Sequence, residues 1–230
     1  LDDDPVERRC ARLLRERLGA ELDGHEAGEG LRALSNLFSP VHSIRQVFLL
    51  MPTSSAEDWA VVARRMARVP EAYRGFRASL EEGARRGLLV APRQVSTVVE
   101  QLGEWLAARP FFGGFAAGGP DALRGELDDA ARAADGAVAE MRDFLREVYL
   151  PQVEGTPDAV GRDRYALAAR RWTGSDLGAG DGLEEAYAWG WAEHRRIVAE
   201  QWAEAERVVP GSTPMEAMRW LDMHGPAVDG

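Results

Sequence analysis

The chain has 230 residues, 45% of them hydrophobic, and a formal net charge of −10. Nucleic acids and anionic membranes attract basic surfaces, so this acidic balance argues against both as partners. No apolar run approaches the roughly 20 residues that cross a bilayer, and residues 1–4 lack the features of a secretory signal, which together predict a cytoplasmic protein.

Apolar residues recur at helical spacing along most of the chain, while period-two alternation is absent. Helices are expected over residues 5–22, 55–69, 70–86, 92–106, 121–150, 157–172, 183–209 and 214–224, and a short apolar helix or turn over residues 43–51. The glycine-rich stretch 111–120 is expected to be a loop. The sequence therefore predicts an all-α protein: a multi-helix bundle with no significant sheet and one very long helix on its C-terminal side, roughly 40 Å in length.

Several helix ends are marked by local signals. Ser55 with Asp58, and Thr213 with Glu216, have the spacing of a capping box, in which each side chain accepts a hydrogen bond from the other residue's backbone. Gly24 is expected to end the first helix, because glycine is a common helix stop. These signals predict boundaries without reference to the rest of the fold.

We expect a single helical domain over residues 1–230. The apolar face of the last predicted helix begins and soon stops, which we interpret as a boundary within a larger protein. An incomplete protein should expose a contiguous apolar patch, met by the missing part, a partner chain or a second copy of this chain. The places expected for that patch are Trp220 and Leu221 in the last helix and Phe111, Phe112 and Phe115 in the glycine-rich stretch.

Sequence motifs typical of catalytic, phosphate-binding or metal-binding sites are mostly missing. All 28 basic residues are arginine, so the chain has no lysine for a Schiff base or a phosphate-binding loop. The four histidines are His25, His42, His194 and His224, and none is spaced to share a zinc ion with another. His25-Glu26 begins like a zinc-protease motif, but the required second histidine is absent, and a loop is expected there. We therefore assign no catalytic residue and no metal ligand, and expect the chain to bind no stoichiometric zinc.

The longest predicted helix carries the densest cluster of unusual side chains. Tyr187, Trp191 and His194 fall on one face at spacings of four and three, a face that Val198 and Trp202 continue. This stripe is either a buried core face, the commoner arrangement, or a ligand-facing groove lined by aromatic rings. On the neighbouring face Glu193, Arg196 and Glu200 have the spacing of an ion-pair ladder. The five candidate substrate-channel residues are Tyr187, Trp191, His194, Glu193 and Arg196.

Three segments carry a further pattern, in a fixed order along the chain. They are Ser39-Pro40 through Ile44-Arg45-Gln46-Val47-Phe48 to Met51-Pro52, Tyr73-Arg74-Gly75-Phe76 through Leu80-Glu81-Glu82-Gly83 to Pro92, and Ala186-Tyr187-Ala188-Trp189-Gly190-Trp191-Ala192-Glu193, followed by Arg196 and Ile197. Together they resemble the N-terminal half of the bacterial domain of unknown function 885 (DUF885) family, over about Val6 to Leu221.

The resemblance implies a helical scaffold from a gluzincin-like zinc metallopeptidase of about twice this length. It places the zinc motif in a C-terminal half, so zinc is expected there and no cofactor in this chain. The chain would wall the substrate channel, with Glu193 and Arg196 bracing neighbouring helices and a peptide as the possible substrate. The alternative is a stand-alone helical binding or interaction module without catalytic activity.

Overall fold

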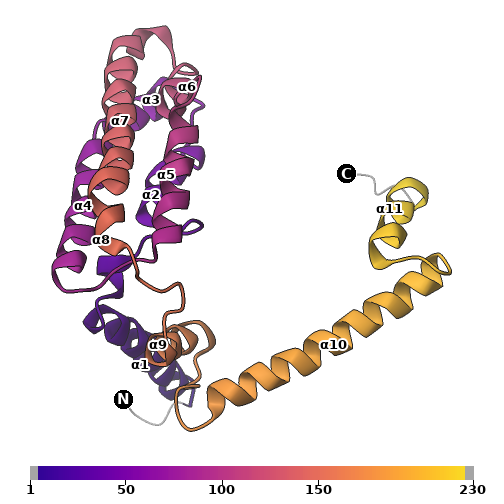
Figure 1. Cartoon of the computed structure of the whole chain (residues 1–230). Coiled ribbons are helices and arrows are strands. Elements are labelled where there is room, and N and C mark those ends of the chain that lie inside the picture. The colour runs from indigo at the N-terminus through magenta and orange to yellow at the C-terminus, as the bar shows by residue number, and fades with distance from the viewer. Residues whose placement is uncertain (1–4, 226–230) are drawn as a thin grey trace. The chain divides into compact units, whose positions relative to one another are not determined.

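The computed structural model describes residues 5–225 (Figure 1). Every regular element in that range is helical, which confirms the predicted all-α class. None of the described helices is long and apolar enough to cross a membrane. Residues 1–4, which bore on secretion, lie outside the described range. The chain divides into two compact units, Leu1–Gly161 and Arg162–Gly230, each described here by itself, and the single domain expected over residues 1–230 stays a prediction.

Unit 1 is a bundle of helices arranged around one central helix. Its elements are α1 (Pro5–Glu26), the 3-10 turn η1 (Glu29–Arg32), α2 (Pro40–Leu49), α3 (Ala56–Met66), α4 (Val69–Arg85), α5 (Pro92–Leu106), α6 (Phe111–Ala116), the 3-10 turn η2 (Asp121–Leu123), α7 (Arg124–Phe144), the π turn η3 (Leu145–Tyr149) and α8 (Leu150–Val153). The central helix α7 contacts α3, α4, α5 and α6, so it forms the middle of the bundle (Figure 1).

The core of unit 1 follows from the apolar spacing of these helices. On α7 the small residues Ala130 and Ala134 and the larger Val138 recur at intervals of four and are buried. Small side chains on the central helix allow several neighbouring helices to approach it, and larger ones such as Phe48 and Phe112 fill the space between them. Their rings meet edge to face at a centroid distance of 5.3 Å.

Local signals placed several helix ends correctly. Ser55 Oγ accepts a hydrogen bond from the Asp58 backbone at 3.1 Å, and Asp58 Oδ2 accepts one from the Ser55 backbone at 3.0 Å, so the predicted capping box at α3 is confirmed. The prediction that Gly24 ends α1 is wrong, because the helix continues to Glu26. A glycine within a helix costs only about 1 kcal/mol relative to alanine. The chain turns instead at Gly28, whose φ of 73° is left-handed.

The loop expected at the glycine-rich stretch is partly wrong, since its first six residues form α6. Two residues outside the stretch form hydrogen bonds with backbone groups at the two ends of this short helix. The Asp135 carboxylate accepts hydrogen bonds from the backbone N–H groups of Phe112 and Gly113, at 3.1 and 2.9 Å. Arg124 donates to the carbonyl of Ala116 at 3.1 Å. A negative group at the N-terminus and a positive group at the C-terminus both favour the helix dipole.

The single helix expected over residues 121–150 is interrupted near its end. It begins as η2, continues as α7, and passes through the π turn η3 into α8. Pro151 lies at the start of α8 and has no backbone N–H, so it cannot form the usual helical hydrogen bond, and its ring would clash with the carbonyl four residues earlier. The wider π turn accommodates this residue without ending the helical path.

Unit 2 has three helices within residues 162–225. They are α9 (Arg162–Thr173), α10 (Gly182–Val208) and α11 (Pro214–His224). The start expected for α9 at residue 157 is wrong, because Gly161 adopts a left-handed φ of 81° immediately before the helix. The capping box at α11 is confirmed: Thr213 Oγ1 accepts from the Glu216 backbone at 3.3 Å, and Glu216 Oε2 accepts from the Thr213 backbone at 2.8 Å. Ala205 of α10 and Ala217 of α11 are buried where the two helices meet.

Candidate binding surface on helix α10

Both ends of α10 are supported by charged side chains. Glu184 and Glu185 lie in its first turn, where negative charge favours the helix dipole. Arg162 of α9 forms an ion pair with Glu184 and donates to the Gly180 carbonyl at 2.7 Å, so α9 fixes the start of α10. Near the other end Arg207 pairs with Glu204 at 2.8 Å. The helix spans Gly182–Val208, one residue earlier at each end than the sequence predicts.

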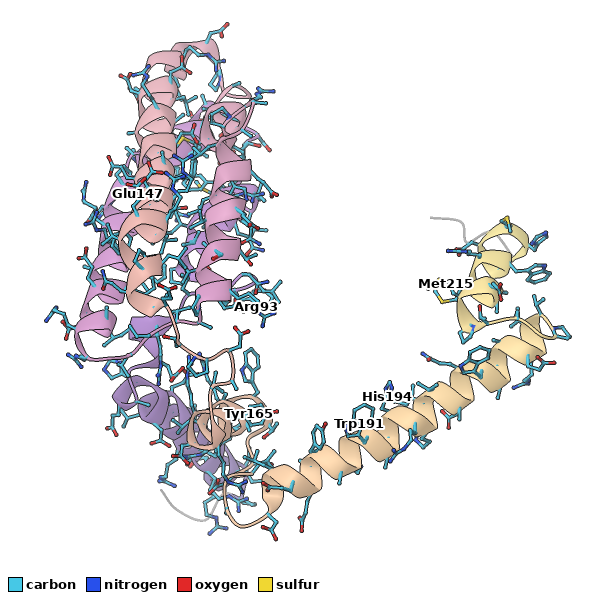
Figure 2. All side chains as sticks on the ribbon, viewed as in Figure 1. Arg93, Glu147, Tyr165, Trp191, His194 and Met215 are labelled. Carbon is cyan, nitrogen blue, oxygen red and sulfur yellow. The ribbon has the colours of Figure 1, made fainter. Side chains whose placement is uncertain are left out.

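Tyr187, Trp191 and His194 form a continuous row on α10, which we call the aromatic edge. The rings of Tyr187 and Trp191 meet edge to face at 6.2 Å, and those of Trp191 and His194 at 5.7 Å. Figure 2 shows Trp191 and His194 on the same side of the helix. Each ring therefore leaves part of its surface free for another molecule.

The aromatic edge is exposed, so the interpretation as a buried core stripe is wrong within unit 2. Tyr187 is 70% exposed and Trp191 47% exposed, and His194 is exposed as well. The reason is the size of the unit. Within it α11 covers α10 only near Ala205, which is the buried residue of α10. In the part of unit 2 that the structure describes, Tyr187, Trp191, His194 and Trp202 of this face remain exposed.

Glu193 and Arg196 do not belong to the aromatic edge. Arg196 Nε donates to Glu193 Oε2 at 2.8 Å, and its Nη1 donates to Glu200 Oε1 at 2.6 Å, so the predicted ladder is present. The hydrogen bond from Arg196 lowers the pKa of Glu193, and both carboxylates raise the pKa of Arg196. These pairs lie within α10, whereas the sequence interpretation had them brace neighbouring helices. Exposed ladders contribute only a few tenths of a kcal/mol per pair.

The apolar patches expected elsewhere are only partly present. In α11, Trp220 is 40% exposed and Leu221 44% exposed, as expected of an uncovered helix. Around α6 the expectation is wrong: Phe112 is buried, and Phe111 and Phe115 pack against the core of unit 1. These rings are covered because the stretch folds into a helix against α7.

Unit 1 contains a serine–histidine pair that the sequence pattern did not indicate. Ser39 Oγ lies 2.9 Å from His42 Nδ1, and His42 Nε2 lies 3.0 Å from Gln101 Oε1. Gln101 donates its own N–H to the Asn36 carbonyl at 3.0 Å, which orients the amide so that its oxygen accepts from His42. His42 Nδ1 then accepts from the Ser39 hydroxyl. Because Ser39 is buried, this network joins α2 to α5 and does not present a nucleophile.

The four histidines belong to four different helices. They lie at the end of α1, on α2, on α10 and at the end of α11. Within residues 5–225, no group of three or more histidine, cysteine, aspartate or glutamate side chains is placed to hold a metal ion.

Comparison with known proteins gives a family. No curated protein matches the chain. A family model described as a bacterial protein of unknown function, DUF885, matches residues 1–229, nearly the whole chain. The chain therefore belongs to the DUF885 family of bacterial proteins.

Proposed function

We propose that this chain is the substrate-binding wall of a zinc-dependent peptidase, in which the aromatic edge of α10 contacts the peptide. The observation that carries the proposal is the exposed row of Tyr187, Trp191 and His194, whose rings touch one another along one side of the helix. Aromatic rings offer large, rigid, partly polar contact surfaces to a peptide, and the imidazole adds a hydrogen-bonding group. The peptidase class rests on the resemblance of three segments to the DUF885 family, whose members look like gluzincin-like zinc metallopeptidases.

The proposal assigns no step of the reaction to these residues. In peptidases of this kind a bound zinc ion activates a water molecule for attack on the peptide carbonyl. The described residues do not fit such a centre, because no suitable group of ligands comes together among them. The proposal places the zinc ligands and the general base in another segment, either a C-terminal half or a partner chain. This chain would position the peptide.

The aromatic edge is tested by binding of a fluorescein-labelled, unstructured peptide rich in leucine and phenylalanine. Trp191→Leu should weaken binding about tenfold, equivalent to about 1.4 kcal/mol, because it removes the central ring of the edge. Trp189→Leu is the matched control: Trp189 is 69% exposed on the same helix but faces roughly the opposite side. His194→Ala should also weaken binding, with little change in melting temperature since His194 is exposed. Equal effects of the two tryptophan substitutions would refute the edge as the binding surface.

The peptidase class needs a separate test, on the protein isolated from its natural source. Peptide hydrolysis that is lost with a chelator and restored by zinc would support the proposal. Peptide binding at the aromatic edge without any hydrolysis would instead favour the alternative, a helical binding module.

A further inference from the structure

Arg45 of α2 has an unusual environment in unit 1. Its guanidinium carbon lies over the ring of Trp105 from α5, 4.5 Å from the centroid, and over the ring of Phe111 from α6, at 4.7 Å. Cations are attracted to the negative faces of aromatic rings. The side chain, which belongs to α2, is thus in contact with α5 and α6 as well, and no acidic residue in the described part of the chain pairs with it.

The donors of Arg45 have no acceptor among the described residues. Its Nε is enclosed and makes no hydrogen bond, and neither Nη group makes one, although these are not enclosed. A buried donor left without an acceptor destabilises the folded protein, so an arriving acceptor would be favoured there. Other arginines of unit 1 show that acceptors are plentiful in this acidic chain: Arg77 pairs with Glu81 at 2.8 Å, and Arg68 with Glu71 at 3.0 Å.

In this arrangement the two Nη groups of Arg45 are available to donate hydrogen bonds to a ligand. Trp105 and Phe111 lie against the guanidinium carbon, and the two Nη groups, which carry four of its N–H donors, are not enclosed. That planar fork matches a carboxylate, which accepts two parallel hydrogen bonds. The nearby His42 ring meets Trp105 edge to face at 5.6 Å, and both of its nitrogens already have partners, so it does not compete for the anion.

The positive charge of Arg45 affects the pKa of Tyr73. Burial raises the pKa of the Tyr73 hydroxyl, and the positive charge of Arg45 works in the opposite direction. Among residues 5–225 no carboxylate pairs with Arg45, so its charge is available to attract an anion.

We propose that Arg45 is the centre of a binding site for a carboxylate-bearing ligand, with Trp105 and Phe111 as positioning residues that hold the guanidinium. The carboxylate is either that of a small organic acid or the C-terminus of a peptide. The site belongs to unit 1 and does not depend on the aromatic edge of α10, so each proposal can fail without the other.

The test is a titration of the isotope-labelled chain observed by NMR at the Arg45 Nε–H and the Trp105 indole N–H. The probes are acetate, the peptide Gly-Gly-Phe with a free C-terminus, and the same peptide amidated at its C-terminus, all at constant ionic strength in chloride. We expect saturable shifts of both signals with the free peptide and at least about tenfold weaker binding of the amidated one. Acetate binding as tightly as the free peptide identifies a general carboxylate site, and weaker acetate binding identifies a peptide C-terminus.

Two substitutions distinguish a carboxylate-binding role of Arg45 from a role only in packing the three helices. Arg45→Lys keeps the positive charge but removes the fork, and should weaken carboxylate binding about tenfold. Arg74→Lys is the control, because Arg74 is an exposed arginine on α4. Should Arg45→Lys unfold the chain, Trp105→Leu provides a second variant that keeps the guanidinium while removing one ring, and it should weaken binding several-fold. The proposal is overturned if no carboxylate shifts the two signals saturably, or if Arg45→Lys or Trp105→Leu binds as tightly as Arg74→Lys.

Discussion

At the scale of single residues, Asp135 supplies the cap at the N-terminus of α6. The sequence Phe111–Ala116 contains two glycines, which disfavour helix, and Pro110 before it offers no side chain to cap the helix. Asp135 lies 22 residues from Gly113 along the chain, yet its carboxylate takes the position of a capping side chain. Sequence spacing could not reveal this partner, because the contact exists only after α6 packs against α7.

Substitution of Asp135 tests this role. Asp135→Ala should lower the free energy of unfolding by about 1 kcal/mol, because the N–H groups of Phe112 and Gly113 lose their acceptor. The measurement is chemical denaturation. Asp129→Ala is the matched control: Asp129 lies on the same helix and forms only an exposed ion pair with Arg132, so its loss should change stability by less than about 0.5 kcal/mol. Equal losses in the two variants would show that Asp135 does not cap α6.

The same carboxyl predicts a pH effect. Burial raises the pKa of Asp135 above its ordinary value of 3.8, more than the hydrogen bonds from Gly113 and Phe112 lower it. The folded state therefore keeps this proton to higher pH than the unfolded state does. The stability from this proton is fully present below pH 3.8 and is lost as the pH rises through the folded-state pKa.

The measurement is the difference in free energy of unfolding between wild type and Asp135→Asn, followed upward from pH 3. All other groups titrate in both proteins, so the difference isolates Asp135. It should fall as the pH rises and then become constant. A difference that increases with pH would show that hydrogen bonding outweighs burial at this carboxyl.

At the scale of elements, helix starts marked by a capping box were predictable, whereas the isolated glycine signal at Gly24 and the proline signal at Pro157 each misplaced a helix end. The capping boxes at Ser55 and Thr213 need only residues three apart, and both form as predicted. The ladder at Arg196 likewise depends only on helical spacing. Whether a helical face is covered depends on which helices pack against it, so the spacing of Tyr187 and Trp191 predicted a shared face but not its exposure.

The capping box of α3 gives an element-scale prediction. Ser55→Ala should lower the free energy of unfolding by about 1 kcal/mol, because the backbone N–H of Asp58 loses its acceptor at a helix whose inner face lies in the core. Ser54→Ala serves as the control, since Ser54 contacts Asp58 through its backbone alone and that bond survives the substitution. Thermal or chemical denaturation compares the two. A loss for Ser54→Ala as large as for Ser55→Ala would exclude the side-chain cap as the cause.

At the scale of the whole chain, the two units differ in what they bury. Unit 1 has one continuous core formed by residues from α2 through α8. In the described part of unit 2 the buried apolar residues are Ala205 and Ala217, both small. Its large apolar side chains remain exposed, among them Trp172, Tyr187, Trp189, Trp202, Met218 and Met223. Burial of apolar surface is the main source of stability, so unit 2 has far less of it than unit 1.

This contrast predicts unequal hydrogen exchange. Backbone amides of α10 should exchange much faster than those of α7, because helices with little tertiary packing open locally at low cost in free energy. Mass spectrometry of peptic fragments measures both helices in one experiment. A peptide ligand that binds the aromatic edge should slow exchange around Tyr187–His194 and leave α7 unchanged, since it covers surface that unit 2 leaves open. Protection of α10 equal to that of α7 in the free chain would contradict the exposed edge, because it would require another surface to cover that face already.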